Sequence, residues 1–150
     1  MKKTQKNENI LLRNDIDGVA TLTLNRPEFN LLSIDLLMAL QSQFEHIATD
    51  TSVRVVVIAS KGRAFCGGHD LQEMRAYPSK KDINNLFTQC SKMMIGITKL
   101  PQPVIAKVHG SAAAAGCQLV AQCDLAVASD TAQFGTSGIN IGLFCSTPMV

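Results

Sequence analysis

The order of hydrophobic and polar positions predicts strands that alternate with helices. Apolar and small polar residues alternate from Ile16 to Asn25, which predicts a strand ending at the turn-prone Arg26-Pro27 step. Short apolar runs predict three further strands, and the first is a continuous β-branched run typical of a buried strand. These strands span residues 53–59, 104–108 and 125–128.

Helical spacing of apolar residues predicts two amphipathic helices and one shorter helix of small residues. The first helix has Ser33 as a suitable N-cap and extends to about Thr49. The second runs from Lys81 to Ile97, and the small-residue helix covers about Ala113 to Ala121. We therefore expect the α/β class, with a polar N-terminal end over residues 1–15 and one core domain over residues 16–150.

Two loops rich in glycine and alanine, at residues 63–71 and 109–119, each follow an apolar strand and open a helix. Small residues let backbone N–H groups approach a ligand closely, and a helix N-terminus adds unpaired N–H groups and a positive dipole end. Such donors are suited to a carbonyl oxygen that becomes negatively charged during a reaction. The loops therefore predict an oxyanion hole for a thioester.

Four segments carry a resemblance to the crotonase superfamily of enoyl-CoA hydratases and isomerases, most closely to its enoyl-CoA hydratase domain-containing protein 3 branch. They lie in the family's order, at residues 24–28, 65–71, 116–126 and 142–148. The resemblance implies a crotonase-like β-β-α superhelix. It also implies that the C-terminal helical region, which covers the acyl pocket and builds a homotrimer or hexamer, is missing from this chain.

The resemblance further implies which residues contact an acyl-CoA or enoyl-CoA thioester. Backbone N–H groups of His69 and Ala115 would form the oxyanion hole. Contacts to coenzyme A, which is part of the substrate and the only cofactor group expected, would come largely from the backbones of Asn30, Leu31, His69, Asp70, Leu71 and Gln72. Two questions stay open: whether Arg26 replaces a basic residue of the family, and whether Asp70 instead caps the helix that starts at Leu71.

The family's two catalytic glutamates correspond to Gln118 and Gly138 in this sequence. Gln118 can hydrogen-bond a water but cannot accept its proton, and Gly138 has no side chain. Each such acid or base contributes about 10²- to 10⁴-fold in rate. We therefore expect a protein that binds acyl-CoA thioesters but has weak or no hydratase activity.

Two other functions remain in view. One is an active hydratase, isomerase or acyl-CoA hydrolase that uses substitute residues, such as Cys145 or Ser146 as a nucleophile or the His69 ring as a base. We expect instead that the His69 ring lines the pocket or faces solvent. The other is a non-catalytic assembly module that binds through the apolar end of the chain, from Ile139 to Val150.

Composition narrows these possibilities. The 150 residues are 46% hydrophobic and 17% charged, with a net charge of +2 and one basic cluster, at Lys2, Lys3 and Lys6, so we expect neither nucleic-acid nor membrane binding. Five cysteines without a Cys-x-x-Cys pair, and no signal or transit peptide, predict a cytoplasmic protein with reduced thiols.

We expect no metal site, because His46, His69 and His109 are isolated in the sequence. We expect structural roles for four further residues. Cys90, Cys117 and Cys123 are predicted to be small buried side chains, and Asp124 is predicted to be a hydrogen-bonding partner near a helix end.

Overall fold

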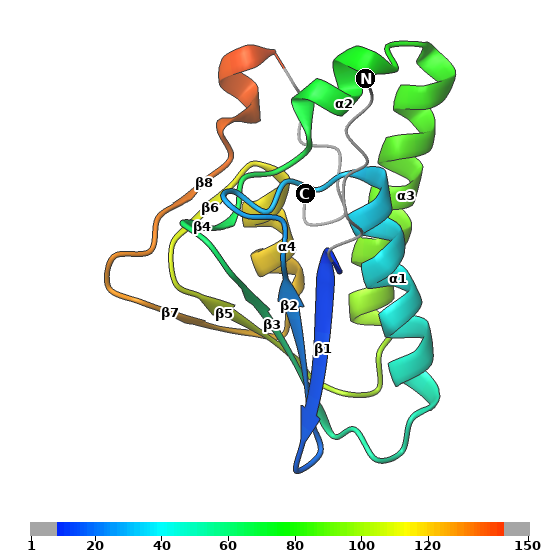
Figure 1. Cartoon of the computed structure of the whole chain (residues 1–150), viewed down its shortest axis with the longest axis vertical. Coiled ribbons are helices and arrows are strands. Elements are labelled where there is room, and N and C mark those ends of the chain that lie inside the picture. Colours follow the sequence, from blue (N-terminus) through cyan, green and yellow to red (C-terminus); the bar gives the residue numbers. More distant parts are fainter. Residues whose placement is uncertain (1–8, 143–150) are drawn as a thin grey trace.

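The computed structural model describes residues 9–142 and arranges them as two β-sheets with helices beside them (Figure 1). The larger sheet has the strand order β1-β2-β3-β5-β7, and the smaller has the order β4-β6-β8. In the larger sheet only β1 and β2 pair in antiparallel fashion, and the other neighbours are parallel. The predicted α/β class is confirmed.

The five strands of the larger sheet are β1 (Leu11–Ile16), β2 (Val19–Leu24), β3 (Val55–Ser60), β5 (Val104–Val108) and β7 (Leu125–Ala128). The strands of the smaller sheet are β4 (Ala64–Cys66), β6 (Ser111–Ala113) and β8 (Phe134–Gly135). The helices are α1 (Ile34–Thr49), α2 (Leu71–Ala76), α3 (Lys80–Thr98), α4 (Ala115–Gln122) and the 3₁₀ helix η1 (Ser137–Ile141).

Strand β1 corrects the predicted polar N-terminal end. Its six residues pair with β2 from Leu11↔Leu24 to Ile16↔Val19, so part of the segment 1–15 belongs to the sheet. The strand was missed because Arg13, Asn14 and Asp15 interrupt its apolar pattern. Such residues suit an edge strand, which is solvated on one side. The basic cluster near Lys2 lies outside the described residues.

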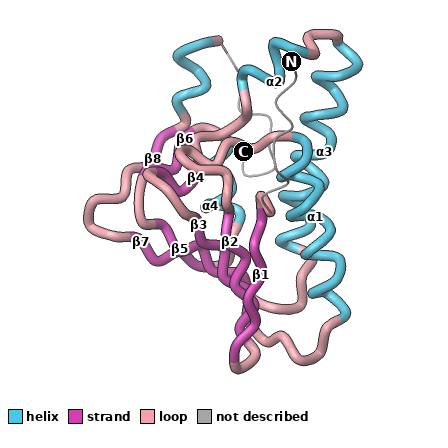
Figure 2. The backbone as a smooth tube through the Cα atoms, in the orientation of Figure 1, coloured by secondary structure: helices cyan, strands magenta, loops and turns pink. Residues whose placement is uncertain are grey.

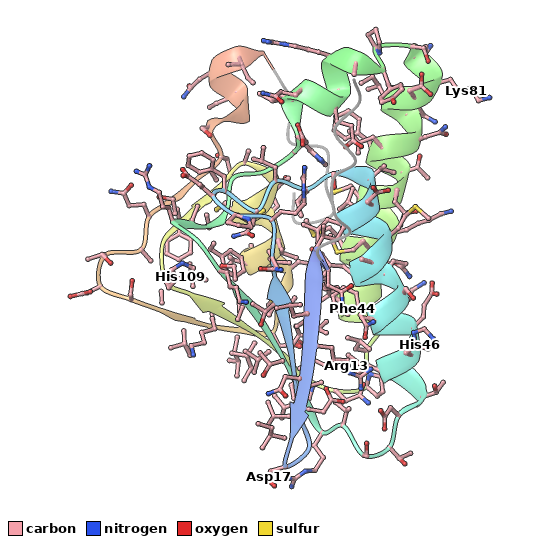
Figure 3. All side chains as sticks on the ribbon, in the orientation of Figure 1. Arg13, Asp17, Phe44, His46, Lys81 and His109 are labelled. Atoms are coloured by element: carbon pink, nitrogen blue, oxygen red, sulfur yellow. The ribbon has the colours of Figure 1, made fainter. Side chains whose placement is uncertain are left out.

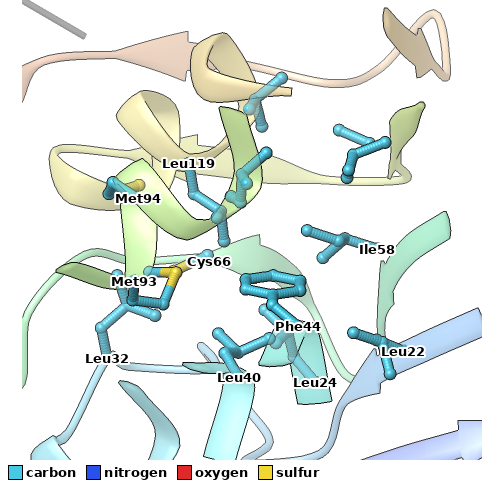
Figure 4. Close-up of a cluster of buried hydrophobic side chains, with 14 of the residues drawn as sticks. Leu22, Leu24, Leu32, Leu40, Phe44, Ile58, Cys66, Met93, Met94 and Leu119 are labelled. Carbon is cyan, nitrogen blue, oxygen red and sulfur yellow. The ribbon is translucent and has the colours of Figure 1, made fainter. Parts of the chain in front are cut away.

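Helices α1 and α3 lie side by side along one face of the larger sheet (Figures 1 and 2). The hydroxyl of Ser33 accepts a hydrogen bond from the Leu36 amide, which confirms the predicted cap of α1. Apolar side chains from both helices and the sheet close the core around Phe44, with Leu40, Ile58 and Met93 among its neighbours in the cluster (Figure 4). This core fixes the strands from which the two glycine-rich loops emerge.

The far end of the sheet is less covered. Strand β7 is exposed along its whole length, with Leu125 62% and Val127 64% exposed. Ile139 and Ile141 of η1, which belong to the apolar segment from Ile139 to Val150, are also exposed. The rest of that segment lies outside the described residues. Within residues 9–142 no helix is both long and apolar enough to cross a membrane.

Candidate functional site

The structure brings the two predicted loops into direct backbone contact. Strands β4 and β6 pair in parallel, so the loops that follow them leave the sheet side by side. A Cβ atom placed on Gly68 would lie 3.3 Å from the Ala115 nitrogen, and one placed on Gly116 would lie 2.2 Å from the Cys66 carbonyl oxygen. Only glycine fits this approach at Gly116, and the φ of +92° at Gly68 also favours glycine there.

Two backbone N–H groups at this junction lack hydrogen-bond acceptors among the described residues. Leu32 forms a β-bridge with His69, but its bonds go to the neighbours: the Leu32 amide donates to Gly68, and the Asp70 amide donates to Leu32. Within residues 9–142 the His69 amide therefore has no hydrogen-bond acceptor. Ala115 is the first residue of α4, where N–H groups have no partner within the helix.

The backbone turn into α4 falls on Ala114 rather than on Ala115. Ala114 has a φ of 48°, whereas Ala115 is absent from the described residues with positive φ. An alanine at position 115 avoids backbone strain only if its φ is negative. This condition is met, so the methyl group of Ala115 imposes no backbone strain on its amide.

The His69 side chain is partly buried. It packs edge-on against Phe87 of α3, with ring centroids 5.4 Å apart and an interplanar angle of 86°. Its Nδ1 atom is buried and has no hydrogen-bond partner among residues 9–142. Burial lowers the pKa of His69 below its ordinary 6.5, although the backbone of Leu32 opposes the shift. The imidazole is therefore neutral at pH 7.

Asp70 has the capping role that the sequence analysis weighed against ligand contact. Its Oδ1 accepts hydrogen bonds from the amides of Gln72 and Glu73, at 3.1 and 3.2 Å, and so caps α2. Its Oδ2 lies 3.0 Å from Nη2 of Arg26. Burial alone raises the pKa of Asp70, but the bonds from Arg26 and the two amides outweigh it and leave the pKa below 3.8.

The guanidinium of Arg26 has two partners within the protein. Its Nη1 donates to the Leu31 carbonyl at 2.6 Å while its Nη2 pairs with Asp70. The guanidinium thus ties the turn after β2 to the first loop. A role as a free phosphate-binding cation would require it to leave both partners.

Asn30 is fully buried and holds that same turn together. Its side-chain oxygen accepts from the Arg26 amide, and its side-chain nitrogen donates to the carbonyls of Lys61 and Ala64. Its φ of 48° is one that asparagine tolerates better than most residues. With the side chain fully used, a contact between Asn30 and coenzyme A would have to come from the backbone. Leu71 and Gln72 are exposed at the start of α2.

The two positions of the family's acids have different surroundings. Gln118 lies one turn after Ala115 in α4 and is 2% exposed, and its Nε2 has no hydrogen-bond partner within the described residues. Gly138 belongs to η1, which stands apart from α4 in Figure 1. The structure therefore places Gln118 beside the loop junction but does not bring Gly138 to it.

A cavity of about 420 Å³ lies nearby, between the start of α1, α2 and α3. Met74 and Leu86 contribute apolar wall, while Asp35, Glu73 and Asp82 contribute carboxylates. None of the predicted oxyanion residues lines it. Its acidic rim would repel the phosphates of coenzyme A, so we do not assign it to the nucleotide.

The structural roles predicted for Asp124 and for the cysteines are confirmed in part. Asp124 accepts a hydrogen bond from the Val104 amide at 2.7 Å, which confirms its structural role. Cys90 is buried, and burial raises the pKa of its thiol to about 12, whereas Cys117 and Cys123 are only partly buried. Cys145 and Ser146 lie outside the described residues.

No group of residues in the described part of the chain could hold a metal ion. His46 lies on α1 and His109 on the other side of the sheet, where its Nε2 is 2.9 Å from the Gly62 carbonyl oxygen (Figure 3).

The fold and the paired loops define an α/β protein of the crotonase type, and comparison with known sequences gives the same result. Residues 14–149 match the family described as Enoyl-CoA hydratase/isomerase, and the chain belongs to this family. The human enoyl-CoA hydratase domain-containing protein 3, mitochondrial, is 47% identical over 136 residues, which are 90% of this chain and 45% of the human protein. The resemblance to this branch is thus confirmed.

Solved structures support the same assignment. A crystal structure of an enoyl-CoA hydratase from Mycobacterium smegmatis superposes with a TM-score of 0.90 at 59% identity, covering 94% of this chain and 56% of that one. The human domain-containing protein 3 gives a TM-score of 0.85 at 44% identity, covering 93% and 55%. The chain thus spans about half the length of the relatives it matches.

The predicted cytoplasmic location is wrong by the same comparison. Five curated relatives, at 42% to 47% identity, are all named as mitochondrial proteins. The prediction depended on the lack of a recognisable transit peptide at the start of this sequence. Because the chain matches only part of its relatives, that observation carries little information about location.

Proposed function

We propose that this chain binds acyl-CoA or enoyl-CoA thioesters by donating hydrogen bonds from the His69 and Ala115 amides to the thioester carbonyl oxygen. The observation that carries the proposal is the contact between the two loops at Gly68 and Ala115, where two N–H groups lack acceptors among the residues that the structure describes. Donors fixed in place before the ligand arrives bind developing negative charge without reorganisation.

The proposal extends to weak or absent hydratase activity. Hydration needs a group that takes a proton from water and a group that delivers one to the α-carbon. The amide of Gln118 can orient a water molecule but cannot accept its proton, and Gly138 has no side chain. Polarisation of the thioester would remain, while proton transfer to and from water would not.

Two properties of the whole protein belong to the same proposal. Because this chain spans about half of its relatives, the acyl-chain preference and a trimeric or hexameric assembly depend on residues beyond those described. The exposed β7 and η1 are consistent with further protein covering this end.

A titration of the purified chain with crotonyl-CoA, followed by calorimetry and by the absorbance of the conjugated double bond, tests both parts. We expect saturable binding with no loss of conjugation above the uncatalysed rate. The absence of binding would refute the thioester site, and rapid loss of conjugation would refute the weak-hydratase part.

A further inference from the structure

His109, at the start of the second glycine-rich loop, contacts the first loop directly. Its Nε2 lies 2.9 Å from the Gly62 carbonyl oxygen. A carbonyl oxygen only accepts hydrogen bonds, so Nε2 is the donor. A Cβ atom on the next residue, Gly110, would lie 2.6 Å from the Arg63 carbonyl oxygen. The two loops are therefore in contact where they enter β4 and β6 as well as at the junction beyond these strands.

The same residue joins the carboxyl ends of three neighbouring parallel strands of the larger sheet. His109 directly follows β5. Its Nδ1 lies 3.5 Å from the hydroxyl of Ser60, at the end of β3, and its carbonyl accepts a hydrogen bond at 3.2 Å from the hydroxyl of Ser129, which follows β7. With both ring nitrogens beside a partner, the orientation of the imidazole is fixed although the residue is exposed.

Strands β4 and β6 are too short to fix their own alignment by pairing alone. They share two residue pairs, Ala64↔Ser111 and Cys66↔Ala112, with an irregularity between them. Phe65 is fully buried and anchors β4 in the core, but β6 carries only serine and alanine. Side chains of this size do little to distinguish one register from the next. A contact outside the ladder therefore helps to hold β6 in register with β4.

This register sets the distance between the two proposed amide donors. His69 and Ala115 each lie three residues beyond the second pair of the ladder. A strand advances about 3.3 Å per residue, so a slip by one residue would displace one amide by about the length of a hydrogen bond. The bond between His109 and Gly62 holds the other end of the ladder, since each of these residues lies two positions before the first pair.

We propose that His109 is a positioning residue for the thioester site. Its hydrogen bond to Gly62 keeps β4 and β6 in register and so holds the His69 and Ala115 amides at the spacing that one carbonyl oxygen requires. This inference rests on the proposed function. The His109 ring lies where the chain enters the two short strands, and the amides lie beyond their other end. Loss of the ring should therefore weaken only the interactions that involve the carbonyl.

The test compares butyryl-CoA with the thioether butyl-CoA, which has a methylene group in place of the carbonyl. Calorimetry gives the two dissociation constants, and their ratio measures the contribution of the carbonyl oxygen. His109→Ala and His109→Phe both lack the donor, and we expect each to lower the ratio about three- to tenfold, the equivalent of about one hydrogen bond. The affinity for butyl-CoA, which uses neither amide, should be unchanged. Because His109 is exposed, both variants should fold, and circular dichroism checks this.

Two control variants separate positioning from general stability. Glutamine has a side-chain N–H group as many bonds from Cα as Nε2 of histidine, so His109→Gln should retain the wild-type ratio. His46 also lies against a backbone carbonyl, with Nδ1 2.7 Å from the Ser42 oxygen, but it belongs to α1, well apart from His109 (Figure 3). His46→Ala should therefore leave the ratio unchanged.

Each outcome has its own meaning. A wild-type preference for butyryl-CoA that persists in folded His109→Ala and His109→Phe overturns this inference and leaves the thioester site standing. An equal loss of affinity for both ligands, or a loss that His109→Gln shares, also overturns it, because neither follows from a misplaced amide. Equal affinities of the wild-type chain for the two ligands refute the site itself and with it this inference.

Discussion

Nη2 of Arg26 lies 3.0 Å from Oδ2 of Asp70, and this ion pair joins the turn after β2 to the first glycine-rich loop. Asp70 also caps α2, so one carboxylate fixes the direction in which the chain leaves the loop. The ion pair and the helix cap therefore also fix the position of the neighbouring His69 amide. A site built from backbone groups depends on such side chains, because the donors themselves cannot be repositioned by a rotamer change.

Substitutions at Asp70 separate the cap from the ion pair. Asparagine caps helices about as well as aspartate but carries no charge. We expect Asp70→Ala to lower the free energy of unfolding by about 1–2 kcal/mol and Asp70→Asn by about half as much. Urea unfolding of both variants measures this difference. Equal losses would show that the cap contributes nothing and the pair everything.

The contact between α4 and β4 predicts a sharp difference between two glycine variants. A Cβ at Gly116 would lie 2.2 Å from the Cys66 carbonyl oxygen, whereas a Cβ at Gly135 would meet nothing within 4 Å. We expect Gly116→Ala to destabilise the chain by about 3 kcal/mol or more and Gly135→Ala to change stability by less than about 0.5 kcal/mol. Thermal unfolding provides the comparison, and similar midpoints would argue against the close packing of the loops.

The lowered pKa of His69 predicts a pH dependence of stability with a defined sign. The unfolded chain takes up a proton at His69 near 6.5, before the folded chain does. Between the two pKa values the unfolded state binds more protons, so the free energy of unfolding falls as pH drops below about 6.5. Above 6.5 this residue contributes no pH dependence.

Urea unfolding at about pH 7.5 and about pH 5 measures this effect. The fall in stability should be smaller in His69→Phe than in the wild type. An identical fall in both proteins would mean that the His69 ring titrates normally in the folded chain.

Proline at position 115 tests the second amide donor. Proline suits the first position of a helix but has no N–H group. We expect Ala115→Pro to weaken butyryl-CoA binding about tenfold, since one hydrogen bond to the carbonyl is lost, while Ala115→Ser retains the donor and binds normally. Calorimetry measures both affinities, with circular dichroism as the check that α4 is intact. Unchanged affinity in a folded Ala115→Pro protein would exclude this donor.

The sequence predicted the elements that have clear periodicity or caps. The helix after Ser33 and the strands at 104–108 and 125–128 lie where the pattern placed them. The two- and three-residue strands β4, β6 and β8 were missed, because so few residues carry no period. They form only because the loops meet in space.

The candidate site, like the fold, could be predicted from the sequence only in part. Glycine and alanine runs marked the loops, and the cap by Asp70 followed from its place before α2. No local pattern could find the partner of Arg26, which is 44 residues away, or the contact between His69 and Phe87. Phe87 lies within the helix predicted over residues 81–97, but the helical spacing does not reveal its partner. Such pairs depend on tertiary packing, which a single sequence does not encode in its spacing.

The most direct measurement of the central claim compares two ligands on the unmodified chain. Butyryl-CoA has the carbonyl that the His69 and Ala115 amides would bind, and the thioether butyl-CoA has a methylene group in its place. Two hydrogen bonds to this oxygen predict that calorimetry will show the thioester binding about 10- to 100-fold more tightly. Equal affinities would contradict the account, because they would show that neither amide binds the carbonyl.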